Sequence, residues 1–116
     1  MAVKRIVANI AAARVEDAKA FYGDILDLHL AMDLGWILTF AENGQAAPQI
    51  SIASEGGSGT PVPDLSIEVD NLEEVHRRVV ANGIHVEYGP ITEPWGVRRF
   101  YVRDPFGRLV NILAHV

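Results

Sequence analysis

Two kinds of hydrophobic spacing alternate along the chain and predict its secondary structure. In residues 4–11 one face is formed by alternate apolar side chains, which is the period of a half-buried strand. Residues 18–25 instead place their apolar side chains at helical spacing, which predicts a helix. Short apolar segments at 27–31, 36–40 and 49–53 then predict three strands, because turn-forming Gly and Asn residues separate them.

The second half of the chain repeats this order. After a Gly- and Ser-rich connection at 54–61, an apolar strand is predicted at 64–69. Asn71 then begins a helix as its N-cap, with Glu74 in the capping-box position and Gly83 as the stop signal. The remaining predicted strands are at about 84–88, 97–103 and 108–114.

The repeat defines the expected organisation of the chain. Val15-Glu16-Asp17-Ala18 aligns with Leu72-Glu73-Glu74-Val75, so each half has the order β-α-β-β-β. We expect a single α+β domain over residues 1–116, with internal halves at about 1–54 and 63–116. A ferredoxin-like fold is the alternative, but it would need a β-α-β order twice and fewer strands in each half.

Composition excludes several classes of function. The net charge of −5 argues against a general nucleic-acid surface, which needs an excess of Lys and Arg. The chain contains no cysteine, so disulfides, thiolate catalysis and Cys-based zinc sites are excluded. Its apolar runs are too short to span a membrane, and the N-terminus lacks the apolar segment of a signal peptide. We therefore expect a cytoplasmic protein without membrane or nucleic-acid partners.

Three segments in order along the chain carry a family resemblance. They are Ala20-Phe21-Tyr22 with Leu26, the junction at 68–72, and the turn Asp104-Pro105-Phe106-Gly107. Together they resemble the glyoxalase, bleomycin-resistance and dioxygenase group, the vicinal-oxygen-chelate superfamily. The resemblance covers the whole chain. It implies two modules whose curved mixed sheets surround a ligand cavity, and a homodimer.

Metal enzymes of that superfamily hold an ion with inward-facing side chains from four strands, usually His and Glu. The resemblance places these positions at Val7, at Gln49 or Ser51, at Asp64 and at Asn111. A single carboxylate among neutral groups does not make a conventional centre for a catalytic ion. We therefore expect no metal and no other cofactor. The four histidines lack metal-site spacing and are expected to have structural roles; they are His29, His76, His85 and His115.

Strand alternation indicates which side chains face the cavity. It places Asp64, Ser66 and Glu68 on the face of the lost ligands, and directs Arg99 and Tyr101 inward because Phe100 and Val102 suit the core. Arg99 has two open interpretations: it binds an anionic ligand group, or it pairs with an inward acid. Trp36 and Phe40 share a face with Leu38, and the pattern does not decide whether that face is core or cavity.

A tryptophan on a loop is the clearest candidate for ligand contact. Pro94-Trp95-Gly96 resembles a loop of the bleomycin-resistance branch, which binds drugs without a metal. Trp95 could stack on a planar ligand, or it could only pack the loop against the sheet. The complete set of predicted ligand-binding residues is Trp36, Phe40, Gln49, Ser51, Asp64, Glu68, Trp95, Arg99, Tyr101 and Asn111.

The leading functional hypothesis is a non-enzymatic protein that sequesters a small aromatic compound, as in antibiotic resistance. The net charge and the inward Asp64 and Glu68 favour a cationic ligand. One alternative is a lyase, isomerase or dioxygenase with an irregular ion at Asp64 and Asn111, or an acid/base enzyme using Asp64 or Glu68 without a metal. Another is an auxiliary protein that binds a peptide or a biosynthetic intermediate.

Overall fold

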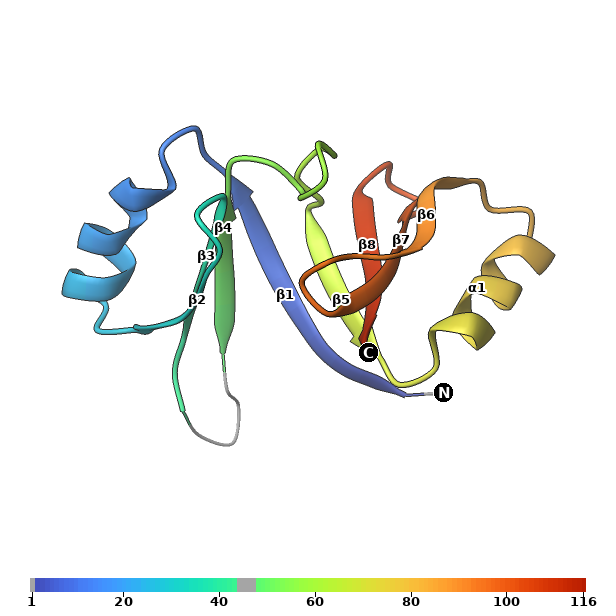
Figure 1. Cartoon of the computed structure of the whole chain (residues 1–116), viewed down its shortest axis with the longest axis horizontal. Coiled ribbons are helices and arrows are strands. Elements are labelled where there is room, and N and C mark those ends of the chain that lie inside the picture. Colours follow the sequence, from blue (N-terminus) through green and yellow to red (C-terminus); the bar gives the residue numbers. More distant parts are fainter. Residues whose placement is uncertain (1, 44–47) are drawn as a thin grey trace. The chain divides into compact units, whose positions relative to one another are not determined.

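The computed structural model describes residues 2–43 and 48–116, and the chain forms two compact units. The N-terminal unit is Val7–Val62. The C-terminal unit is Pro63–Val116 together with the residues up to Ile6. Strand β1 (Val3–Ala11) therefore contributes its two ends to different units (Figure 1).

The N-terminal unit contains strands in the order β2-β3-β4-β1. β1 pairs in parallel with β4 (Gln49–Ala53), and β3 (Ile37–Ala41) lies antiparallel to both β4 and β2 (His29–Asp33). Its core contains Val15, Leu38, Phe40 and Ile52, with Tyr22 packed against them. Leu38 and Phe40 therefore belong to the face beneath the helical segment.

That helical segment differs from a regular α-helix. It consists of a 3-10 turn, η1 (Val15–Asp17), and a π-helix, η2 (Lys19–Ile25). The amide of Leu26 donates to the carbonyl of Phe21 over 3.1 Å, which is the five-residue spacing of a π-helix. No side chain of η2 is fully buried, so packing places little constraint on its winding.

In the C-terminal unit the strand order is β1-β5-β8-β7-β6. These strands are β5 (Leu65–Val69), β6 (Val86–Thr92), β7 (Val97–Arg103) and β8 (Leu109–His115), and α1 spans Leu72–Ala81. The predicted N-cap is confirmed, because the side chain of Asn71 accepts a hydrogen bond from the amide of Glu74. Gly83, at φ +72°, follows the end of the helix as predicted.

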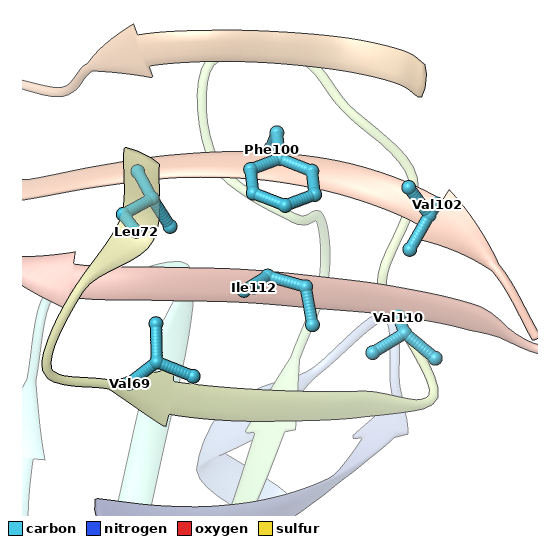
Figure 2. Packing of buried hydrophobic residues seen from close by; sticks show 6 residues of the cluster. All are labelled: Val69, Leu72, Phe100, Val102, Val110 and Ile112. Carbon is cyan, nitrogen blue, oxygen red and sulfur yellow. The ribbon is translucent and has the colours of Figure 1, made fainter. Parts of the chain in front are cut away.

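The core of the C-terminal unit lies between α1 and one face of the sheet. Figure 2 shows its buried side chains on β5, β7, β8 and the start of α1. Phe100 and Val102 come from β7, and Val110 and Ile112 from β8, which confirms the predicted core face of β7. The alternate residues of these strands consequently point to the opposite face of the sheet.

The predicted α+β class and the order of elements are confirmed, because three strands follow the helix in each unit. The largest difference is β6, which extends to Thr92 although the prediction ends near residue 88. Gly and Pro are unfavourable inside a central strand, but β6 lies at the edge of the sheet and accommodates Gly89 and Pro90 with irregular pairing. No helix in the described part of the chain has the length and apolarity needed to cross a membrane.

The turn before β8 positions that strand. Asp104 accepts hydrogen bonds through Oδ1 from the amides of Phe106 and Arg108, over 2.8 and 2.9 Å. Gly107 adopts φ +81°, a backbone conformation that favours glycine. The turn fixes the register in which Tyr101 lies opposite Asn111.

Replacement of the central core ring tests this packing. Phe100 is fully buried, so Phe100→Ala should lower the free energy of unfolding by about 3–5 kcal/mol through lost burial and a residual cavity. Urea denaturation measures the change. The matched control is Phe106→Ala on the exposed hairpin, which should change stability by less than about 0.5 kcal/mol. Equal effects of the two substitutions would contradict this assignment of the core.

Candidate functional site

A row of polar side chains crosses four strands of the C-terminal unit. Ser66 lies opposite Asn111, Asn111 opposite Tyr101, and Tyr101 opposite Tyr88. Their immediate neighbours in sequence include Ile67, Phe100 and Ile112, which pack towards α1. Because side chains alternate along a strand, the polar row lies on the face that α1 does not cover. We call this surface the polar face.

Asn111 lies in the middle of the polar face and is only 7% exposed. Its Nδ2 donates to Ser66 Oγ over 3.1 Å. Its Oδ1 is buried and has no hydrogen-bond partner among the described residues. An amide oxygen removed from water without a donor is energetically costly, so an oxygen in this state is an acceptor available to an N–H or O–H group.

Next to this row, Arg99 forms a buried ion pair with Glu93. Glu93 Oε2 lies 2.8 Å from Nε and 2.6 Å from Nη2 of Arg99, and both side chains are 3% exposed. Nη1 donates to the hydroxyl of Tyr101 over 3.0 Å, and the Tyr88 hydroxyl donates to Glu93 over 3.0 Å. Asp64 and Glu68 were the acids considered as partners for Arg99, but the structure provides Glu93 instead.

Aromatic rings surround the guanidinium of Arg99. Its Cζ atom lies 5.0 Å from the ring centroids of Trp95 and Tyr101, and 5.3 Å from that of Tyr88. These are cation–π distances. One face of Trp95 is therefore in contact with a cation from its own chain, and Trp95 remains only partly buried.

The two acids predicted to face the cavity already have partners. Asp64 precedes β5, and its Oδ2 accepts from the amide of Leu109 over 3.0 Å. Glu68 contacts Arg5 Nε at 3.0 Å, Lys4 Nζ at 3.8 Å and His115 Nδ1 at 2.9 Å. Glu68 is thus neutralised by cationic side chains, which weakens its part in the argument for a cationic ligand, whereas Asp64 is exposed and keeps its negative charge.

These contacts change the acidity of Glu68. Burial raises the pKa of Glu68, but the hydrogen bond with His115 and the positive charges of Arg5, His115 and Lys4 outweigh that effect. The pKa of Glu68 consequently lies below its ordinary value of 4.5. His115 is the last residue of β8, where it joins the end of that strand to β5.

The remaining predicted site residues lie in the N-terminal unit. Ser51 faces Thr39, and their hydroxyls are 2.8 Å apart in a buried hydrogen bond. Gln49 begins β4 opposite Ala41. Phe40 was predicted as a ligand contact, but the structure places it in the core, 1% exposed and beside the ring of Tyr22. Trp36 precedes β3, is partly buried, and its carbonyl accepts from the amide of Ser54.

The residues at the positions expected to bind a metal do not suit a catalytic ion. The side chain of Val7 has no atom that can coordinate a metal. Ser51 and Asn111 are neutral, and they are hydrogen-bonded to Thr39 and to Ser66, respectively. The carboxylate of Asp64 is held by a backbone amide. Within residues 2–43 and 48–116, no group of three or more His, Asp or Glu side chains is placed to hold a metal ion. Divalent ions with open coordination positions need stronger ligands than this set.

Comparison with known proteins agrees with the two-unit fold. The model of the Glyoxalase/Bleomycin resistance protein/Dioxygenase superfamily matches residues 4–112. The chain belongs to this superfamily. Members of the glyoxalase superfamily include enzymes and resistance proteins, bind small molecules and often dimerise. No curated protein matches the chain.

Solved structures share the glyoxalase-superfamily fold at low sequence identity. A protein from Vibrio splendidus 12B01, described as a superfamily member, is 15% identical, with a TM-score of 0.65 and coverage of 99% of this chain and 100% of that chain. The methylmalonyl-CoA epimerase of Mycobacterium tuberculosis is 16% identical, with a TM-score of 0.65 and coverage of 98% of this chain and 87% of that chain.

A protein from Legionella pneumophila, named as an NAD-dependent benzaldehyde dehydrogenase, is 16% identical, with a TM-score of 0.75 and coverage of 97% of this chain and 100% of that chain. At these identities all three comparisons show the fold alone.

Two members of the polar face were missed by the sequence analysis. Glu93 immediately precedes the Pro94-Trp95-Gly96 segment, and Tyr88 lies in β6. The sequence signal for the ion pair was an acid just before this turn and an arginine, Arg99, just after it. Only the β6–β7 pairing brings both residues to Arg99.

The charge cluster at Glu68 predicts a specific dependence of stability on pH. Because its pKa is lower in the folded protein, Glu68 contributes stability that is present above about pH 4.5 and is lost as the pH falls through the folded-state pKa. Urea denaturation of the parent and Glu68→Gln proteins should therefore differ most near neutral pH and converge in acid. A constant difference at every pH would contradict this role.

Proposed function

We propose that this member of the glyoxalase superfamily binds a small aromatic compound on the polar face, without a metal ion and without chemical conversion. The observation that carries the proposal is the buried Oδ1 of Asn111, which lacks a partner among the described residues. A ligand N–H or O–H would satisfy this acceptor. Because Oδ1 is shielded from solvent, a ligand reaches it only when a neighbouring side chain turns aside.

The surroundings of Asn111 support an aromatic ligand. Tyr101 lies directly opposite it in the sheet but is only 1% exposed, whereas Trp95, on the same face beyond Arg99, is partly buried and is the ring that a ligand can reach. Aromatic side chains provide rigid area on which a planar group stacks, while one polar group fixes its orientation. The Pro94-Trp95-Gly96 segment also resembles the metal-free bleomycin-resistance branch, so aromatic and glycopeptide antibiotics are the first compounds to test.

The charges of the polar face favour recognition by hydrogen bonding. Arg99 is paired with Glu93, Glu68 with cationic side chains, and Asp64 with a backbone amide. The charges of Arg99 and Glu68 are thus satisfied by side chains of the same unit, which supports recognition of the ligand through the neutral acceptor of Asn111.

Substitution of Asn111 tests the proposal. In a Trp36→Phe background Trp95 is the remaining indole, so its fluorescence reports binding on the polar face. Asn111→Leu should weaken the binding of a compound from the panel by about two- to tenfold, which corresponds to one lost hydrogen bond. Phe106→Ala on the exposed hairpin is the control and should bind as tightly as the parent, because it leaves the polar face unchanged. Binding should be unchanged after dialysis against a chelator.

Two results would contradict the proposed function. One is a flat Trp95 response across aromatic and glycopeptide antibiotics. The other is purified protein that contains stoichiometric Fe, Ni, Zn or Mn, because the ligand set described above does not account for such an ion.

We further propose that the protein is a homodimer formed through the N-terminal unit. A groove of about 410 Å³ lies between the strands and the helical segment, and its lining includes Ile10, Phe21 and Tyr22. Ile10 is 41% and Phe21 51% exposed. Arg14 and Asp17 line the same groove and already form an exposed ion pair with each other, with Arg14 Nε 3.8 Å from Asp17 Oδ1. The groove therefore carries one charge of each sign and does not repel a second copy of itself, which favours a second copy as the occupant.

A charge in this groove should separate the protomers. Phe21→Glu places a carboxylate in an apolar contact, so light scattering should change from the mass of two chains to that of one. Phe106→Glu is the matched control, because Phe106 is 86% exposed on the hairpin of the other unit, and it should remain dimeric. A monomeric parent protein would contradict the proposal.

A further inference from the structure

The tryptophan of the polar face stands on a tight turn between β6 and β7. The amide of Glu93 donates to the carbonyl of Val97 over 2.7 Å, and the amide of Gly96 donates to the carbonyl of Glu93 over 3.2 Å. These bonds close the turn at its base, but they leave more than one rotamer of Trp95 open, because the backbone restricts side-chain torsions without fixing a single one.

The guanidinium of Arg99 lies over the indole of Trp95. Arg99 Cζ is 5.0 Å from the ring centroid of Trp95. The guanidinium is itself held by Glu93 through Nε and Nη2, and by the Tyr101 hydroxyl through Nη1. A planar group fixed at three nitrogens cannot turn about its own axis, so it presents one defined flat surface to the ring.

We propose that Glu93 is a positioning residue for ligand binding: through Arg99 it holds the indole of Trp95 in a single orientation on the polar face. Its use in ligand binding rests on the proposed function. Glu93 touches Arg99 and need not touch a ligand. Its effect on affinity arises because a preorganised ring loses less conformational freedom when a ligand stacks on it.

The burial of the Glu93–Arg99 pair favours a positioning role over simple stabilisation. Removing both charges from water is costly, and a buried ion pair is often replaced by apolar residues without loss of stability. Both side chains of this pair are 3% exposed, so the desolvation cost offsets much of their attraction. Apolar side chains of similar size could fill the same volume. They would lack the hydrogen bonds that orient the plane of the Arg99 guanidinium over the ring of Trp95.

The experiment uses the full chain with Trp36→Phe, so that emission comes from Trp95 alone. The double variant Glu93→Leu with Arg99→Met removes the pair together, which avoids leaving one buried charge unpaired. It should fold, with a urea midpoint lowered by the hydrogen bonds that the Tyr88 and Tyr101 hydroxyls lose. Its Trp95 emission should nevertheless shift to longer wavelength, its anisotropy should fall, and quenching by acrylamide should increase.

A conservative variant distinguishes positioning from charge. Arg99→Lys retains the positive charge beside Glu93 but lacks the planar fork, so it should show the same loss of Trp95 anisotropy. Restoration of the parent anisotropy by lysine would overturn the proposal. So would a folded double variant with unchanged emission and quenching. If the double variant fails to fold, the Arg99→Lys protein decides the question by the same readouts.

Ligand affinity completes the test. Loss of one oriented side chain should weaken the binding of a panel compound by about two- to tenfold in each variant. Because emission and quenching are read without ligand, a parent protein that binds no compound would overturn the proposed function while the orientation of Trp95 is still measured. Altered Trp95 spectra with full affinity would overturn only the role of Glu93 in binding.

Discussion

The alternation of side chains along β7 is the constraint on which the C-terminal unit depends. Phe100 and Val102 point towards α1, so Arg99 and Tyr101 must point to the other side of the sheet. A shift of one residue in the register of β7 would place the guanidinium in the apolar core. The core and the polar face are consequently two results of one pairing, and the Asp104 turn that fixes this register also positions Asn111.

Satisfaction of buried charge explains the chemistry of the polar face. Glu68 lies among cationic side chains of its own unit, and Arg99 is held between a carboxylate and aromatic rings. Ionised groups withdrawn from water need such partners. Oδ1 of Asn111 has no hydrogen-bond partner among the described residues, and because it is neutral it can remain buried at a lower cost than a charge. A face of this kind suits recognition by hydrogen bonding and stacking.

Several features followed from local sequence. β7 has the bounds that its pattern predicts, and α1 begins at the cap that Asn71 and Glu74 indicate. Both depend on residues close in sequence, namely strand periodicity and a side chain that reaches an amide three positions away. The prediction was poorer where competing signals met. The predicted strand near 84–88 continues through Gly89 and Pro90 to Thr92, and the apolar residues after Ala18 suggested an ordinary helix where a π-helix forms.

The sequence by itself determined the order of the elements, the face of β7 on which each residue lies, and the chemical character of Val7, Ser51, Asp64 and Asn111. These properties depend on side-chain identity and on a period of two residues, which are local. Only the tertiary structure decided which side chains contact one another. Glu93 reaches Arg99 because β6 and β7 pair, and Phe40 enters the core because the helical segment covers that face of β3. Such contacts depend on distances through space between strands, which the order of residues along the chain does not specify.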